Sequence, residues 1–309
     1  MKKIAVMGAG SLGGYFGGRL AQVGNEVSFI ARGAHLKAIQ DHGLRIISPK
    51  GDAHLTNILA TNNPAEIGAV DIVLFMVKNG DVEDAAEAIK PLIGSDTLIV
   101  TCQNGVTAWE RLGNVVGTDH IVPGVARIPG QITQPGTIKH GAELDILLFG
   151  EVDGSNSERC NMLSKLLSNA GTTPVLTNTI IHELWSKFCG QTALASLTTL
   201  TGLDIGPLRE NKASAQLFKD AILEAYQVGR AAVPDLPESV LKHNWDFVQR
   251  LPAHMHASML DDLRQGKPLE NEYLSGDVVR LGRQYDIDTP IHSTLYAALK
   301  PISDQLAAS

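Results

Sequence analysis

The chain has 309 residues, more than one hydrophobic core usually holds, so two domains are predicted. Apolar residues make up 44% and charged residues 19% of the sequence, which is typical of a globular protein and excludes a disordered chain. The net charge of −7 argues against a nucleic-acid partner, and no apolar run approaches the roughly 18 residues of a membrane span.

The N-terminal stretch predicts a strand, a glycine turn, a helix and a second strand. Residues 4–7 are an apolar run typical of a buried parallel strand. A G-x-G-x-x-G motif follows over residues 8–13, and apolar residues then recur at helical spacing up to residue 23. Residues 27–31 form the second apolar strand. In this context the motif predicts a dinucleotide-binding turn, although a merely tight turn between strand and helix is the alternative.

Each glycine of the motif has its own expected task. Gly8 lets the chain turn out of the strand, Gly10 lets a pyrophosphate approach the backbone, and Gly13 lets the helix pack close to the strand. Free N–H groups at the helix start, around Ser11 and Leu12, favour an anion there. We expect all five residues to bind the cofactor.

The end of the second strand predicts which cofactor is used. NAD enzymes usually carry an acidic residue there to bind the ribose 2′-OH. This chain has Arg32 instead, whose planar guanidinium suits a 2′-phosphate. The sequence favours NADP(H) over NAD, unless Arg32 is only a solvated surface residue.

The following residues continue an alternation of strands and helices. Strands are expected at 44–47, 55–60, 71–77 and 97–101, with helices at 34–42 and 81–91. Alternation of this kind predicts a doubly wound parallel sheet of Rossmann type. Strands at 121–122, 137–140 and 145–149 are expected to extend the sheet antiparallel, before a helix at 155–170 and a last strand at 174–176.

The pattern changes near residue 178, where strands stop. Helices are expected at 179–200, 213–232, 237–248, 257–265, 269–285 and 290–305. We therefore predict an α/β fold with an NADP-binding domain over residues 1–178 and an all-α substrate and catalytic domain over residues 179–309.

Polar residues follow two of the parallel strands. Lys78 and Asn104 each stand after the carboxyl end of a strand, where ligands of open α/β sheets bind. The bland alternatives are an exposed charge for Lys78 and a plain Asn-Gly turn for Asn104. We expect both to face the cofactor.

The helical half carries four further candidates. Lys187 and Gln191 share one face of a largely apolar helix, so Lys187 either snorkels to solvent or has a function. Ser258 reads as a helix cap or a ligand group, and Glu270 is expected in the first helical turn after Pro268.

Together these residues make the chain resemble the ketopantoate reductase (2-dehydropantoate 2-reductase) family. The matching stretches are Gly8 to Gly13 with Arg32, Val77-Lys78, Gln103-Asn104-Gly105, Trp185-x-Lys187, Ser258-Met259-Leu260-x-Asp262, and Glu270. The resemblance implies a Rossmann domain, a helical domain, and NADPH-dependent reduction of a 2-oxo acid to a 2-hydroxy acid, as in the pantothenate pathway.

The resemblance also implies roles for single residues. Lys187 matches the catalytic lysine, and Glu270 matches the glutamate near it. Asn104 and Lys78 match residues that line the nicotinamide and substrate cleft, and Ser258 matches the serine that binds the substrate carboxylate.

The chain departs from the family at the substrate site. Family members that make pantoate carry asparagines four and eight residues after the lysine, where this chain has Gln191 and Ala195. Ala126-Arg127 also stands where small hydroxyl residues are expected. The predicted substrate is therefore a small-molecule 2-oxo acid of unspecified identity, and an opine-type or imine reductase or a silent NADP-binding sensor stays open.

Other signals predict little chemistry. His254 and His256 are spaced wrongly to share a helix face, so no metal is expected. The three separated cysteines predict reduced thiols in a cytoplasmic protein, and the first strand begins too early to leave room for a signal peptide. A homodimer is compatible with the sequence, which does not fix the oligomeric state.

Overall fold

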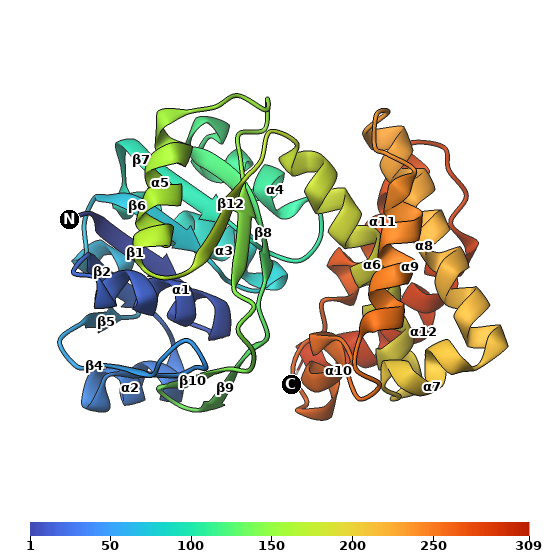
Figure 1. Ribbon diagram of the computed structural model, residues 1–309, viewed down its shortest axis with the longest axis horizontal. Helices are drawn as coiled ribbons and strands as arrows, with labels where there is room; N and C mark the ends of the chain where they lie inside the picture. Colours follow the sequence, from blue (N-terminus) through green and yellow to red (C-terminus); the bar gives the residue numbers. More distant parts are fainter. Residues whose placement is uncertain (309) are drawn as a thin grey trace. The chain divides into compact units, whose positions relative to one another are not determined.

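A computed structural model of the chain describes residues 1–308. These residues form two compact units, which are described separately (Figure 1). The first comprises Met1–Gln103 and Ala108–Ile180, and the second comprises Asn104–Thr107 and the residues from Ile181 onward. The short segment Asn104–Thr107 thus belongs by its contacts to the C-terminal unit.

The N-terminal unit is built on an eight-stranded sheet with the order β12-β11-β8-β7-β6-β1-β2-β5. Its strands are β1 Lys3–Met7, β2 Glu26–Ile30, β5 Leu59–Thr61, β6 Val70–Phe75, β7 Ile93–Thr101, β8 Ile121–Arg127, β11 Ile146–Phe149 and β12 Thr173–Leu176. The six strands from β5 to β8 are parallel, and β11 runs antiparallel to β8. The predicted α/β class with a parallel sheet and an antiparallel extension is confirmed.

Two details of the strand prediction are wrong. The strand at 121–122 is the start of β8, which pairs parallel with β7, because α4 Ala108–Val116 intervenes and returns the chain to the same edge. The strand expected at 137–140 is β10 Thr137–His140, which belongs to a second sheet. It pairs with β3 and β9 and so does not extend the main sheet.

The second sheet has four strands in the order β4-β3-β10-β9. Its remaining strands are β3 Leu44–Ile47, β4 Ala53–Leu55 and β9 Gly130–Gln134. The single strand expected at 55–60 is therefore wrong, because the chain leaves one sheet after β4 and enters the other at β5. An apolar run alone does not reveal that its two halves pair with different partners.

Helices cover both faces of the main sheet. They are α1 Ser11–Gln22, α2 Gly33–His42, α3 Val82–Ala88, α4 Ala108–Val116 and α5 Glu158–Asn169. Along β1, Ile4 and Val6 face the core under α1, α2 and α5, whereas Ala5 faces the core under α3 and α4. Burial on both faces explains why the strand reads as a continuous apolar run.

Glycines let α1 lie close to both sheets. A Cβ on Gly17 would lie 2.5 Å from Val6 of the main sheet, and one on Gly14 would clash with Ile138 of the small sheet. Glycine inside a helix costs about 1 kcal/mol relative to alanine. Here close packing on two sides offsets that cost, so α1 is held firmly with its N-terminus after the glycine turn.

The C-terminal unit contains no strand among its described residues. Its helices are α6 Ile180–Thr201, α7 Ile205–Glu210, α8 Lys212–Ala232, α9 Ser239–Arg250, α10 Ser258–Arg264, α11 Ser275–Gln284 and α12 Pro290–Ala307. Within residues 1–308, none of the helices has the length and hydropathy needed to cross a membrane. The predicted helical second half is confirmed, and α6 is the helix on which Lys187 stands.

The single helix expected at 269–285 is wrong. A short 3-10 turn over Asn271–Tyr273 comes first, and α11 begins only at Ser275. The backbone of Leu274, with φ −112° and ψ −98°, separates the two because it leaves the helical region. Pro268 is therefore not a first helical residue, and Glu270 precedes the 3-10 turn instead of lying in the first turn of a helix.

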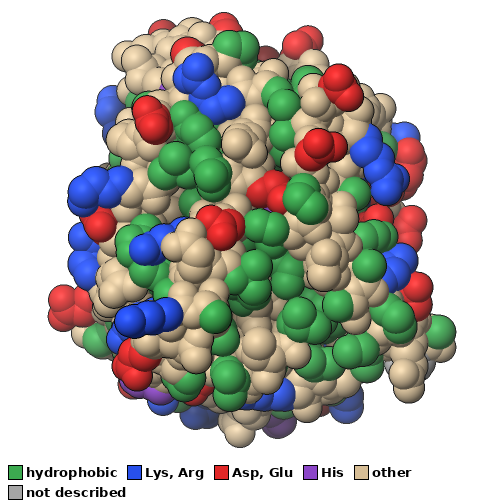
Figure 2. All heavy atoms as spheres, turned by 90° about the vertical axis from the view of Figure 1, so that its right-hand side faces the viewer, with side chains coloured by type: hydrophobic (Ala, Val, Ile, Leu, Met, Phe, Trp, Pro, Cys, Tyr) green, Lys and Arg blue, Asp and Glu red, His purple; other side chains and the backbone are tan. Residues whose placement is uncertain are grey.

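Apolar side chains remain exposed on the helical unit. Figure 2 shows hydrophobic side chains gathered between a few charged ones on one face of the molecule. The large apolar residues of this unit that are more than a third exposed are Leu200, Leu203, Leu217, Leu223, Phe247, Met255 and Ile302. Scattered exposed apolar residues are ordinary on a soluble surface, so they define no site by themselves.

Candidate functional site

The glycine turn between β1 and α1 is required partly by the chain's own packing. Gly8 has a φ of +94°, and a Cβ there would lie 2.9 Å from the backbone of Met76. A Cβ on Gly13 would clash with the carbonyl oxygen of Gly8 and lie 2.8 Å from Val6. Both glycines are thus explained by a sharp turn and by close packing of helix on strand, as the sequence predicted.

Gly10 is different, because nothing in the protein explains it. Its φ of −69° suits any residue, and no atom lies within 4 Å of the Cβ that it lacks. Gly10 is also the N-cap of α1, and no side chain caps the helix there. The open space and the uncapped N–H groups of Ser11 and Leu12 are what a bound pyrophosphate requires, so this turn fits a dinucleotide.

His35 supports the glycine turn from α2. Its Nε2 donates to the carbonyl oxygen of Ala9 at 2.9 Å, and its Nδ1 accepts from the backbone N–H of Gly136 at 3.1 Å. Both bonds suit a neutral ring, and burial lowers the pKa of His35. Sequence reasoning missed this residue, because a lone histidine in a surface helix carries no motif.

Arg32 lies where the cofactor prediction needs it, at the N-cap of α2 after β2. Its side chain is 78% exposed and its Nη2 donates to the carboxylate of Asp81 at 2.8 Å. As predicted, an arginine and no acidic residue follows β2. A carboxylate nevertheless lies beside Arg32, because Asp81 reaches it from the segment after β6. Sequence reasoning missed Asp81.

Lys78 stands three residues beyond the end of β6 and is exposed. The neighbouring strand end is fixed by Gln103, whose Nε2 donates to the carbonyl oxygens of Phe75 at 2.9 Å and Val77 at 3.1 Å. The buried side chain of Gln103 thereby ties the segment after β7 to the segment after β6. Two backbone acceptors for one amide hold the carboxyl ends of both strands in register.

Three predicted residues meet in the C-terminal unit. Lys187 Nζ donates to Oδ1 of Asn104 at 3.0 Å, and Nδ2 of Asn104 donates to Oε2 of Glu270 at 3.4 Å. Glu270 is 6% exposed, and Lys187 and Asn104 are half-buried. The carboxamide of Asn104 thus joins an ammonium to a carboxylate with its oxygen toward the cation and its nitrogen toward the anion. We call these residues the Lys187–Asn104–Glu270 cluster.

In the described part of the chain, the remaining substrate candidates, Gln191 and Ser258, make no hydrogen bond to this cluster. Gln191 is one helical turn beyond Lys187 on α6 and is half-buried. Ser258 is exposed at the first position of α10, and within residues 1–308 no hydrogen bond connects either side chain to the cluster. Ala195 is fully buried.

Of the two histidines near residue 255, His256 has partners in the protein. His256 lies between two carboxylates, with Nδ1 2.8 Å from Asp204 and Nε2 3.0 Å from Asp261. Among the described residues no group of three or more metal-binding side chains occurs.

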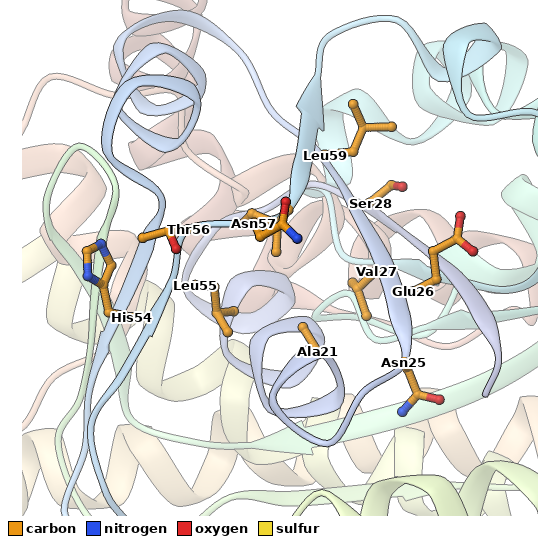
Figure 3. A pocket seen from close by; sticks show the side chains of 11 residues that line it. Ala21, Asn25, Glu26, Val27, Ser28, His54, Leu55, Thr56, Asn57 and Leu59 are labelled. Carbon is orange, nitrogen blue, oxygen red and sulfur yellow. The ribbon is translucent and has the colours of Figure 1, made fainter.

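One hollow of about 390 Å³ lies in the N-terminal unit (Figure 3). Its lining comes from the first half of β2 and from residues 54–59. The glycine turn lies at the other end of β2, since Gly8 and Ala9 donate to the carbonyl oxygen of Ile30. This hollow therefore contains none of the predicted site residues.

Comparison with known proteins identifies the family. Residues 4–154 match the family model described as ketopantoate reductase PanE/ApbA, and residues 179–303 match the model of its C-terminal part. The chain belongs to the ketopantoate reductase family. Its resemblance inferred from motifs is confirmed, and membership makes the protein an oxidoreductase.

Individual relatives agree along the whole chain. A 2-dehydropantoate 2-reductase of Mesorhizobium japonicum is 30% identical over 325 residues, covering 97% of this chain and 98% of that protein. The crystal structure of a PanE/ApbA family ketopantoate reductase from Ralstonia eutropha JMP134 matches with a TM-score of 0.90 at 29% identity, covering 99% of each chain. A D-mandelate dehydrogenase structure matches with a TM-score of 0.87 at 23% identity, covering 99% of each chain, and shares the fold.

Proposed function

We propose that the protein reduces a 2-oxo acid to the 2-hydroxy acid with NADPH. The observation that carries this proposal is that the carboxamide of Asn104 bonds to both Lys187 and Glu270. These residues are 83 and 166 positions from Asn104 in the sequence, respectively. A lysine on a largely apolar helix, held by an amide that a buried carboxylate holds in turn, is suited to proton transfer. Family membership supports the reaction class.

The reduction needs a hydride at the keto carbon and a proton at the keto oxygen. Bound NADPH supplies the hydride. Lys187 supplies the proton, because an ammonium is charged at neutral pH and can both stabilise and protonate a developing alkoxide. The lysine then leaves the step as a neutral amine and regains its proton from solvent.

Asn104 and Glu270 hold the ammonium for this step. The Asn104 oxygen accepts from the Lys187 ammonium at 3.0 Å, which fixes the side on which the amide meets the cation. Glu270 accepts from the Asn104 nitrogen and so keeps the amide from rotating to present its nitrogen to the cation. Positioning of this kind is worth more than its bond energies suggest, because small displacements of a reacting group reduce the rate steeply.

The glycine turn and its surroundings would hold the cofactor. Gly8, Gly10 and Gly13 shape the turn, and the backbone N–H groups of Ser11 and Leu12 would donate to the pyrophosphate. Arg32 would bind the 2′-phosphate, which favours NADP(H), and Lys78 and Asn104 would line the nicotinamide. In this reading residues 1–178 bind the cofactor and residues 179–309 supply the catalytic and substrate groups.

The substrate side rests on Ser258 and Gln191. Ser258 would donate its hydroxyl to the substrate carboxylate, and Gln191 would meet the remaining part of the substrate beside Lys187. Since Ala195 offers no hydrogen bond through its side chain, a substrate hydroxyl buried against it would lack a partner, at a cost of about 1–3 kcal/mol. We infer a 2-oxo acid with a more apolar side chain than ketopantoate.

A substrate panel tests the proposal. Oxidation of NADPH is followed by its absorbance, with ketopantoate and with 2-oxo acids of increasing apolar bulk, each with and without an added amine. A 2-oxo acid reductase turns over in the absence of amine. Turnover only with amine would support an opine-type or imine reductase, and tight NADPH binding without turnover on any acid would support a sensor.

A further inference from the structure

In the C-terminal unit, the loop Asn104–Thr107 runs alongside the segment from Glu270 to Asp277 and is close to it at three points. Asn104 bonds to Glu270, a Cβ on Gly105 would lie 3.0 Å from the carbonyl oxygen of Tyr273, and Thr107 Oγ1 donates to Oδ2 of Asp277 at 2.7 Å. Both segments advance in the same direction. The loop is therefore fixed at its first residue and at its last.

The contact at Thr107 is the stronger of the two by its geometry. Its hydrogen bond is 2.7 Å long and both side chains are buried, with 7% exposure for Thr107 and 3% for Asp277. The other carboxylate oxygen of Asp277 accepts from Arg280 Nη2 at 2.7 Å. A hydroxyl that donates to an ionised, desolvated carboxylate makes a short and strong bond.

The contact at Asn104 is weaker. The bond from Asn104 to Glu270 is 3.4 Å long, close to the limit for a hydrogen bond, and a small shift of the loop breaks it. Gly105 adds no side chain to fix the loop, and its φ of +97° needs a glycine. Gln103 holds the near end of the loop, so the bond of Thr107 to Asp277 is what holds its far end and with it the path of the backbone through Asn104.

We propose that Thr107 and Asp277 are positioning residues that hold Asn104 against Lys187. The proposal rests on the proposed function, since it names what places the Asn104 amide for the proton-donating lysine. Neither residue touches the reacting atoms. Thr107 anchors the loop, Asp277 is the anchor point at the first turn of α11, and Arg280 balances the charge of Asp277.

The test compares Thr107→Val, which keeps the shape and removes the hydroxyl, with Thr107→Ser, which keeps the hydroxyl. We expect kcat to fall about tenfold in Thr107→Val, because the proton donor loses the acceptor that positions it. KM for NADPH should change less than kcat, because the glycine turn is untouched. Thr107→Ser restores most of the rate. Thr172→Val is the matched control, since Thr172 donates a buried bond to Leu167 in the N-terminal unit.

A second readout does not depend on turnover. Brief acetylation labels lysine amines, and mass spectrometry compares Lys187 with Lys242, whose side chain is 81% exposed. Displacement of Asn104 removes one acceptor of the Lys187 ammonium, so labelling of Lys187 should rise in Thr107→Val and stay unchanged in Thr172→Val. If Thr107→Val does not fold, Asp277→Asn leaves a neutral and weaker acceptor and should shift labelling in the same direction.

The outcomes separate the two proposals. A folded Thr107→Val protein with wild-type kcat and wild-type labelling of Lys187 overturns the positioning role. A wild-type protein that reduces no 2-oxo acid overturns the proposed function, and the labelling comparison then still decides whether Thr107 and Asp277 hold Asn104 beside Lys187.

Discussion

Asn104 and Lys187 are joined by a 3.0 Å hydrogen bond although 83 residues separate them in sequence. Asn104 comes from the loop after β7, and Lys187 comes from the second turn of α6. The bond fixes which atom of the amide faces the ammonium, because an ammonium can only donate. Every prediction about catalysis below depends on this pairing or on the glycine turn that would hold the cofactor.

Two glycine substitutions separate ligand binding from packing. In Gly10→Val the new side chain enters space that the protein leaves open, so the fold should persist while NADPH affinity falls by at least about a hundredfold, by loss of the pyrophosphate contacts. In Gly13→Ala the added Cβ clashes within the protein, so thermal stability should fall as well. Calorimetry with NADPH and thermal melting distinguish the two. Unchanged NADPH binding in a folded Gly10→Val variant would show that the turn is not the phosphate site.

Arg32 and Asp81 should set the preference between NADPH and NADH. Arg32→Ala should weaken the binding of NADPH by about tenfold and leave the binding of NADH nearly unchanged, since one charge-assisted contact to the 2′-phosphate is lost. Asp81→Asn removes the carboxylate that pairs with Arg32 at 2.8 Å and should tighten NADPH. The two dissociation constants are measured side by side for each variant. Equal affinity of the wild type for both cofactors would contradict the role given to Arg32.

Much of the fold followed from the sequence, because local signals decided it. The sequence predicted the glycine turn from its motif. It predicted the parallel strands and the long helices from the spacing of their apolar residues. Pairing partners were not local, so the small sheet formed by β3, β4, β9 and β10 was missed. The break in the helix at Leu274 was also missed, because no residue near it in sequence indicates a non-helical backbone there.

The residues of the candidate site also fall into those that the sequence predicted and those that it did not. Lys187, Asn104 and Glu270 were named from the sequence with the help of family motifs, and the structure brings them together. Asp81, His35, Thr107 and Asp277 were missed, because each acts through one partner far away in sequence and none belongs to a recognisable pattern. Spacing reveals residues on one element, and it does not reveal contacts between elements.

The substrate should be more apolar than ketopantoate. The family resemblance implies asparagines at two positions where this chain has Gln191 and Ala195. Gln191 carries its amide one methylene further out and Ala195 carries none, so a polar group of ketopantoate beside Ala195 would lose its partner. We expect kcat/KM for ketopantoate to be lower by about tenfold or more than for the best apolar 2-oxo acid, as unpaired polar groups cost about 1–3 kcal/mol each. Gln191→Asn should raise relative activity on ketopantoate. If ketopantoate is the best substrate in a broad panel, this reading of the two positions is wrong.

His292 should make stability depend on pH. Its ring is fully buried, Nε2 donates to the carbonyl oxygen of Ala221 and Nδ1 accepts from Ser275. Burial lowers the pKa of His292 from 6.5 to about 4. Between these values the unfolded chain binds a proton that the folded chain does not, so stability present above pH 6.5 is lost as the pH falls toward 4, by up to about 3 kcal/mol.

Urea unfolding from pH 7 to pH 4.5 measures this effect. His292→Gln removes the titration and should show a shallower loss of stability than the wild type over this range. Glu224, which accepts from the backbone N–H of His292, has a pKa raised by burial and works in the opposite sense. Glu224→Gln should therefore steepen the loss. Parallel slopes in the wild type and His292→Gln would contradict the assignment.

The most direct measurement is kcat of Lys187→Ala on the best 2-oxo acid, with thermal melting and NADPH affinity recorded on the same protein. We expect a folded variant that binds NADPH as the wild type does and has a kcat lower by about 10²–10⁴-fold, the range for a positioned proton donor. Glu270→Ala should lose less, and the double variant should be far from additive, because the residues act through Asn104 as one unit. A folded Lys187→Ala protein that keeps a wild-type kcat would contradict the assignment of Lys187 as the proton donor.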